Sequence, residues 1–372
     1  IKILFAEHPG LVIQVKDKHK EEVKKILEDA GIGYVKLGKP TEERHILVEK
    51  GDATYQFGID YLRDVWYSTS YLLDRKQSMN GCAKKRFENY KKQPLEFVFD
   101  KSFTGKLSQF DLNPDRRTPT GIKAAIIREK GTNGEREMAY MLYLAGFDVK
   151  DVTMTDLVSG RETLEDINFI VFCGGFSNSD VLGSAKGWAG AFLFNPKAKA
   201  ALDNFYARKD TLSLGVCNGC QLMIELNLIN PDFTKKAKML HNDSHKFESK
   251  FVGVTVPMNR SVMFGSLSGS KLGIWVAHGE GKFSLPYHED KYNVVLKYSY
   301  DEYPGNPNGS DYSVAGLASP DGRHLAMMPH LERSCFPWQN AYYPADRIKN
   351  DQITPWMEAF VNARKWIEMN KK

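Results

Sequence analysis

Apolar, β-branched runs alternate with amphipathic helical stretches from Gly121 onward, and this alternation constrains the fold of the 372-residue chain most strongly. Parallel strands must be joined by crossovers, which are usually helices, so this order favours a parallel sheet. Right-handed crossovers then place helices on both faces of the sheet. We expect strands at 122–128, 147–154, 168–175 and 211–219, and helices at 132–146 and about 197–208.

Composition narrows the class of protein further. The chain is 42% hydrophobic and 26% charged, which argues against disorder. No apolar run approaches the roughly 18 residues of a membrane span. The net charge of +5 is spread along the chain without a dense Lys/Arg block, so we expect neither a membrane nor a nucleic acid as partner. Five scattered cysteines indicate a reducing compartment, the cytoplasm.

The first quarter of the chain has a different pattern. Residues 1–95 predict a small α+β block, and they contain no Gly-rich phosphate loop. Its expected elements are strands at 11–15 and 45–51 and helices at 19–31 and 57–75. Because Ile1 lies inside the strand-like run IKILF, we expect this chain to be a piece of a longer one.

Turn-forming residues separate this block from the alternating region. Residues 96–120 are rich in Pro, Gly and other turn formers, which predicts a linker. The α/β domain then spans 121–372. It closes with a helix at 354–369, for which Thr354 is the expected cap.

The run LGVCNGC carries the strongest local signal for chemistry. An apolar strand turns sharply at Cys217 into an apolar helix, which is the context of a nucleophile elbow. Such a turn lifts the sulfur to a helix N-terminus, where the dipole favours a thiolate. A buried, inert cysteine is the alternative interpretation, and the elbow alone does not separate the two.

Cys220 forms a Cys-x-x-Cys pair with Cys217, as a redox pair or half of a zinc site would. A zinc site needs two more ligands, and the sequence has no second Cys-x-x-Cys. We therefore interpret Cys220 as a packing residue and expect no metal site.

A thiolate nucleophile needs a base and a group that orients the base. In HLAMMPHLER a strand meets a proline, and His330 and Glu332 follow in a loop. Two residues apart in extended chain, their side chains share one side, so Glu332 can fix the tautomer of His330. A solvated surface pair is the alternative. The order Cys217, His330, Glu332 within an α/β domain favours a triad.

A third element ends the strand NFIVFCGG. Gly174 and Gly175 form a bend whose N–H groups, with that of Asn218, could make an oxyanion hole. A simple turn is the alternative. Because ligands bind beyond the carboxyl ends of parallel strands, we expect this bend to lie beside Cys217.

Together these elements resemble a class I, triad-type glutamine amidotransferase domain, with its flavodoxin-like, doubly wound parallel sheet. The closer resemblance is to the C-terminal part of the phosphoribosylformylglycinamidine synthase family, in its large single-chain form. It covers about Ile122 to Lys365, and the first block resembles the tail of that family's second synthetase-like half. The motifs that carry it are REKGTNGEREMA, CGGFSNSDVLGSAKGWA, LGVCNGCQLM, KFESKF, WVAHGEGKF, YPGNPNGS and MMPHLER.

The resemblance implies roles for the matching residues. Cys217 would attack the carboxamide of glutamine, His330 would be the base and Glu332 would orient it. Gly175 and Asn218 would offer N–H groups to the oxyanion.

Two further residues receive roles only from the resemblance. Gln221 would help to hold glutamine. His278 lies in the motif AHGEG, which the family keeps near its glutaminase–synthetase contact, although a purely structural histidine fits as well. The sequence departs from the family pattern GGFSYGD at Asn178 and Ser179.

The resemblance also implies partners. Glutamine would be the substrate and purine biosynthesis the pathway. ATP and magnesium would bind the missing upstream synthetase portion of the same chain, with no cofactor in this piece. Three rivals stay open: another class I amidotransferase, a Cys hydrolase of the same fold acting on γ-glutamyl or peptide bonds, and an interaction domain with an inactive triad.

Overall fold

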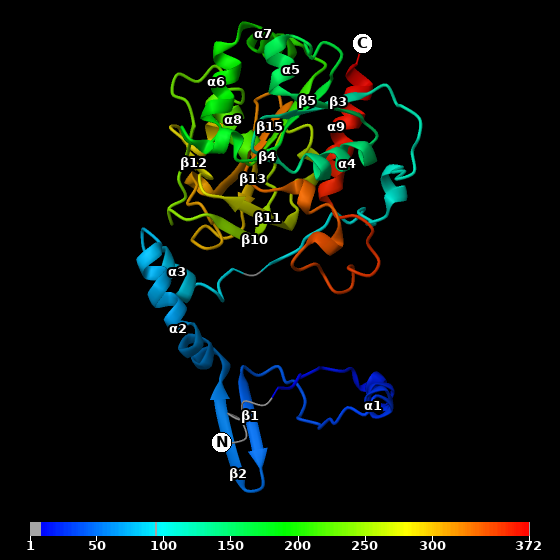
Figure 1. Cartoon of the computed structure of the whole chain (residues 1–372), viewed down its shortest axis with the longest axis vertical. Helices are drawn as coiled ribbons and strands as arrows, with labels where there is room; N and C mark the ends of the chain where they lie inside the picture. Colours follow the sequence, from blue (N-terminus) through cyan, green and yellow to red (C-terminus); the bar gives the residue numbers. More distant parts are fainter. Residues whose placement is uncertain (1–8, 94, 372) are drawn as a thin grey trace. The chain divides into compact units, whose positions relative to one another are not determined.

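The computed structural model describes residues 9–93 and 95–371 (Figure 1). Contacts within the chain divide it into two compact units, Ile1–Val65 and Trp66–Lys372. The strand-like run IKILF lies outside the described residues. The functional boundaries after residues 95 and 120 stay predictions.

The first unit is built from a hairpin and a helix. Strand β1 (His45–Lys50) pairs antiparallel with β2 (Ala53–Gly58), and helix α1 spans Lys20–Asp29. Helix α2 (Ile59–Gln77) begins in this unit and continues into the second. No residue of α1 is fully buried, and of its apolar stripe Val23 and Leu27 are half-buried while Ile26 is exposed.

The helices predicted at 19–31 and 57–75 and the strand predicted at 45–51 are confirmed. The strand predicted at 11–15 is wrong, because no neighbouring strand pairs with it. Leu11 and Val12 are instead 94% and 82% exposed. An apolar run without a ladder partner cannot satisfy its backbone groups as a strand.

A nine-stranded mixed sheet forms the centre of the described second unit, in the order β11-β10-β13-β14-β15-β8-β6-β3-β5. The five strands from β15 to β5 run parallel. This confirms the predicted α/β parallel core. Its strands are β3 (Lys123–Arg128), β5 (Asp148–Thr153), β6 (Phe169–Phe172), β8 (Leu212–Val216) and β15 (His324–Met327).

The other half of this sheet is antiparallel and was not predicted. It extends the parallel core from β15 through β14 and β13 to β10 and β11. Its strands are β10 (Glu248–Thr255), β11 (Lys271–His278), β13 (Asn293–Tyr298) and β14 (Val314–Ala318). Four short strands lie outside it: β4 (Thr132–Asn133), β7 (Gly174–Gly175), β9 (Lys238–Leu240) and β12 (Lys282–Ser284).

Helices cover both faces of the parallel core. The crossover from β3 to β5 runs toward the sheet edge and that from β5 to β6 runs back, so right-handed connections place α4 and α5 on opposite faces. Helix α9 packs against α4, while α7 contacts α5 and α6, and α8 contacts α6 (Figure 1). Their bounds are α4 (Glu135–Ala145), α5 (Met154–Ser159), α6 (Lys186–Phe194), α7 (Pro196–Ala207), α8 (Asn218–Glu225) and α9 (Trp356–Asn370).

The predicted linker follows the surface of the second unit. Helix α3 (Cys82–Glu88) precedes it, and Val98 then exchanges backbone hydrogen bonds with Lys271 at the edge of β11. The predicted cap of the last helix is wrong. The hydroxyl of Thr354 donates to the carbonyl of Ser334 at 2.7 Å, and both residues are buried, so this hydroxyl does not cap the helix.

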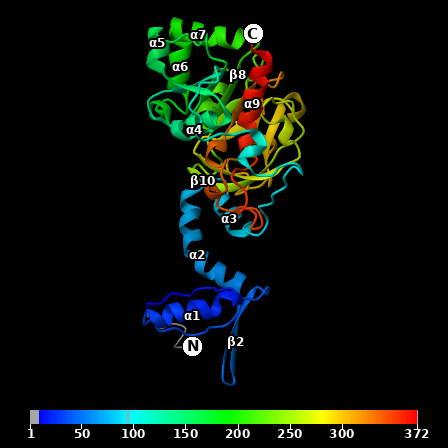
Figure 2. The same cartoon turned by 90° about the vertical axis from the view of Figure 1, so that its right-hand side faces the viewer.

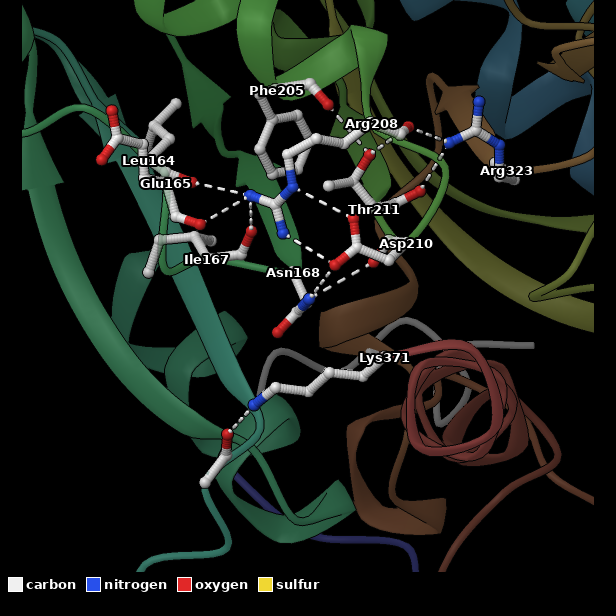
Figure 3. A network of polar contacts seen from close by, with 11 residues as sticks. Leu164, Glu165, Ile167, Asn168, Phe205, Arg208, Asp210, Thr211, Arg323 and Lys371 are labelled. Carbon is white, nitrogen blue, oxygen red and sulfur yellow. Dashed lines mark hydrogen bonds and ion pairs between the residues drawn. The ribbon is translucent and has the colours of Figure 1, made fainter.

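An arginine network holds the ends of the parallel strands that lie away from Cys217 (Figure 3). The guanidinium of Arg208 donates to the carbonyls of Leu164, Glu165 and Ile167 at 2.9–3.1 Å. It also pairs with Asp210, which accepts a hydrogen bond from Asn168. These bonds tie the chain entering β6 to the chain entering β8.

No helix among the described residues is both long and apolar enough to cross a membrane.

The Arg208 network yields a prediction about stability. Arg208→Ala should lower the free energy of unfolding by about 2–4 kcal/mol, because it removes the donor to part-buried carbonyls and the cationic partner of Asp210. Arg161→Ala, which removes an exposed partner of Asp156, should cost less than about 1 kcal/mol. Denaturant unfolding of both variants tests this. Equal small losses would show that the network does not support the core.

Candidate active site

Cys217 occupies a strained turn between β8 and α8. Its backbone has φ 53° and ψ −108°, a conformation that few non-glycine residues adopt. The N–H of Cys217 donates to the carbonyl of Met327 at 2.9 Å, which ties the turn to β15. A Cβ on Gly219 would lie 2.0 Å from the carbonyl oxygen of Phe172, so only glycine lets α8 start this close to β6. The predicted elbow geometry is therefore present.

His330 and Glu332 form a buried pair in the loop after β15. Nδ1 of His330 lies 2.7 Å from Oε1 of Glu332, and the two residues are 2% and 1% exposed. The N–H of His330 donates to the carbonyl of Trp275 in β11 at 2.8 Å. The pair is thus a fixed interior contact, and the alternative of a solvated surface pair is wrong.

Cys217 and His330 flank the same glycine. A Cβ on Gly174 would lie 2.9 Å from Cε1 of His330 and 3.3 Å from Cβ of Cys217. The sulfur of Cys217 lies 3.5 Å from the carbonyl oxygen of Ala277 in β11. Cys217 and His330 are therefore neighbours at Gly174, and Glu332 lies on the Nδ1 side of the imidazole.

Electrostatics favour the charged form of this imidazole. Burial alone would lower the pKa of His330, but the charges of Glu332 and Cys217 and the hydrogen bonds to both raise it to about 10. His330 therefore carries a proton at neutral pH and is poised to give it to a leaving group.

The predicted oxyanion residues gather at the same edge of the sheet. Gly174 and Gly175 form β7, which pairs with β4, and Asn218 opens α8. The side-chain oxygen of Asn218 accepts a hydrogen bond from the N–H of Ser177 at 3.0 Å. The first N–H groups of α8 have no intrahelical acceptor, so that of Asn218 is suited to an anion.

The departure from the family pattern falls on backbone in the left-handed region. Asn178 and Ser179 have φ values of 52° and 57°. The family has a glycine at the second of these positions, and glycine tolerates such angles without strain. The loop still brings Ser177 to Asn218, so the substitution leaves this link intact.

A cavity of about 280 Å³ opens beside the sulfur, and we call it the Cys217 cavity. Gln221 lines this cavity, and both polar atoms of its side-chain amide are hydrogen-bonded. The amide nitrogen donates to the carbonyl of Glu280 at 2.7 Å, and the amide oxygen accepts a hydrogen bond from the side chain of Asn218 at 2.9 Å. A larger hollow of about 490 Å³ between residues 116–119 and α4 lies elsewhere and has no cysteine or histidine in its lining.

His278 ends β11 and also borders the Cys217 cavity. It is 2% exposed, and neither ring nitrogen has a hydrogen-bond partner within the described chain. Burial, together with the nearby charge of His330, lowers its pKa to about 3. The imidazole is therefore neutral and offers one donor and one acceptor.

Sequence reasoning missed much of the cavity wall. Asp180 and Glu280 supply carboxylates, and the segment 241–247 supplies two histidines, a lysine and Phe247. Burial and the charge of Glu280 raise the pKa of Asp180. Their motifs were visible as parts of the resemblance, but no local pattern indicated that these segments meet at one cavity.

Cys220 lies in an apolar setting. Cys220 is fully buried in α8, and burial raises the pKa of its thiol well above the usual value. An unreactive packing residue fits this setting. Within the described ranges, no cluster of three or more His, Cys, Asp or Glu side chains could hold a metal ion.

A parallel α/β core, an elbow cysteine and a buried His–Glu pair define the class of protein. Residues 121–367 match the family of CobB/CobQ-like glutamine amidotransferase domains, and the chain belongs to this family.

Within that class the chain is similar in sequence to phosphoribosylformylglycinamidine synthases. It is 38% identical to the probable chloroplastic/mitochondrial enzyme of Arabidopsis thaliana and 38% identical to the Homo sapiens enzyme, in each case over 98% of this chain. It covers only 27% and 29% of those relatives. A solved structure of PurLQS from Thermotoga maritima matches with a TM-score of 0.50 and 27% identity, over 68% of this chain and 99% of that one. The resemblance inferred from the motifs is confirmed.

The His330–Glu332 pair predicts a pH-dependent contribution to stability. The pKa of His330 is raised from 6.5 to about 10, so its contribution is complete below pH 6.5 and is lost as pH rises through about 10. Glu332→Gln should therefore destabilise the protein most below pH 6.5, and its deficit relative to wild type should shrink toward pH 10. Unfolding free energies measured across this range test it.

Glu289→Gln is the matched control, because its partner Lys297 lies at the surface and is no part of the His330 site. Its small effect should not follow the same profile. A Glu332→Gln deficit that stayed constant from pH 6 to 10 would contradict the assigned direction of the His330 pKa.

Proposed function

We propose that this chain hydrolyses glutamine at Cys217 and releases ammonia. The observation that carries the proposal is that an elbow cysteine lies next to a buried His–Glu pair and lines a cavity. The remaining steps assign each group a place in the reaction.

The thiolate of Cys217 attacks the carboxamide carbon, and the oxygen becomes an anion that the N–H groups of Gly175 and Asn218 stabilise. The C–N bond breaks as His330 gives its proton to the departing nitrogen, which leaves as ammonia. A γ-glutamyl thioester remains on Cys217. His330 then takes a proton from water, the hydroxide attacks the thioester, and glutamate and the thiolate are released. Glu332 holds the imidazole in place throughout.

The walls of the Cys217 cavity suit an amino acid. Asp180 and Glu280 offer negative charge to the α-ammonium group of glutamine, and Lys246 offers positive charge to its carboxylate. Gln221 and the neutral His278 provide hydrogen-bonding groups at the carboxamide end. We assign these as substrate contacts.

The fate of the ammonia follows from the relatives. The chain spans under a third of the phosphoribosylformylglycinamidine synthases that it matches. We propose that an upstream synthetase portion, with ATP and magnesium, uses the ammonia to convert formylglycinamide ribonucleotide to the formylglycinamidine product. The cytoplasmic location stays a prediction.

The rival functions are separated by two assays. An interaction domain with an inactive triad would release no ammonia from glutamine. Another amidotransferase or a γ-glutamyl hydrolase would release it but would not, when joined to the synthetase portion, aminate formylglycinamide ribonucleotide.

Cys217→Ala should abolish glutamine hydrolysis, because it removes the sulfur on which the thioester forms. Cys220→Ser is the matched control: it lies one helical turn away in α8 and should keep activity within roughly a fewfold of wild type. Steady-state ammonia release measures both. Substantial activity in Cys217→Ala, or a collapse of equal size in folded Cys220→Ser, would overturn the assignment.

A further inference from the structure

A buried ionic cluster joins helices α2 and α3, which precede the predicted amidotransferase domain, to the wall of the Cys217 cavity. Asp74, near the end of α2, is 7% exposed. Its carboxylate accepts hydrogen bonds from the hydroxyl of Ser78 at 2.6 Å and from Nζ of Lys246 at 3.0 Å, and it pairs with Arg86 of α3. Asp74 thus holds one cation from each side.

The segment that Asp74 reaches is part of the cavity. Residues 245–247 line it. Two further bonds fasten the preceding residues to the turn between α2 and α3: the N–H of Met79 donates to the carbonyl of Ser244 at 3.0 Å, and the amide of Asn80 donates to that of Asp243 at 2.9 Å. Residues 74–80 thus add three hydrogen bonds to a segment that also bonds to β11 and to the loop at Asn308.

The cluster continues at the start of β10, which lies near α3 in both views (Figure 1, Figure 2). Glu248 is 3% exposed and lies 3.5 Å from a guanidinium nitrogen of Arg86. It accepts hydrogen bonds from Ser244 at 2.6 Å and Tyr303 at 3.0 Å, and pairs with Lys250 at 2.7 Å. The two carboxylates share Arg86, so this one cation links Asp74 of α2 to Glu248 of β10.

We propose that Asp74 is a positioning residue for glutamine: through Lys246 it sets the 243–247 wall of the Cys217 cavity from a helix outside the amidotransferase domain. The proposal rests on the glutaminase function proposed above. It makes substrate affinity depend on the α2–α3 segment, which the resemblance assigns to the synthetase-like half. A change in the surroundings of the α2–α3 segment would therefore change the affinity of the site for glutamine.

Asp74→Asn in the full 372-residue chain tests the proposal, with two measurements. The KM for glutamine should rise roughly tenfold or more while kcat stays within about threefold, because the wall shifts but Cys217 and His330 do not. Amide hydrogen exchange at residues 242–248 should be at least about tenfold faster than in wild type. A loss of folded protein alone would lower the apparent kcat and leave KM unchanged.

Asp203→Asn is the control, because Asp203 forms an exposed pair with Lys199 on the remote helix α7. It should change neither measurement. Asn80→Gly removes the amide bond to Asp243 at a position whose φ of 53° suits glycine, so it decides the matter if Asp74→Asn does not fold. It should raise KM severalfold.

Unchanged exchange at 242–248 would overturn the proposal, and so would faster exchange with an unchanged KM. Absence of glutamine hydrolysis in wild type would instead contradict the proposed function. The exchange measurement would still decide whether Asp74 positions the wall.

Discussion

The positive φ of Cys217 is the constraint on which the rest of the site depends. At this angle the chain leaves β8, directs Cys217 to the cavity and enters α8 within one residue. The surrounding structure keeps the turn in this strained conformation. The Met327 carbonyl accepts a hydrogen bond from the turn, and Gly219, which has no side chain, lets α8 pack closely against β6. Since β15 leads directly to His330, the same contact that fixes the elbow also places the base.

The parallel core, the elbow and the His–Glu pair could be predicted because each depends on residues close in sequence. Strand–helix alternation sets the core, one turn sets Cys217, and a spacing of two sets His330 and Glu332. What failed depends on distant partners. The predicted strand at 11–15 needed a pairing strand that the described chain does not provide. Thr354 donates its hydroxyl to a carbonyl twenty residues away instead of capping the last helix.

The cavity wall shows the same limit at a larger scale. Asp180 follows the parallel strand β6, whereas residues 241–247 precede β10 and Glu280 follows β11 in the antiparallel half. No periodicity in the sequence predicts that these segments come together, because their contact depends on which strand pairs with β15. The wall also depends on Asp74, so the site extends beyond the residues 121–367 that the family match covers.

The central claim is that Cys217 is the nucleophile toward glutamine, and covalent capture tests it most directly. A diazoketone analogue of glutamine alkylates the thiolate that attacks the γ-carbonyl, and peptide mass mapping locates the adduct. We predict one equivalent on the peptide that contains Cys217, prevented by excess glutamine and absent from Cys217→Ala. An adduct on Cys220 or Cys173, or no adduct on a chain that hydrolyses glutamine, would contradict it.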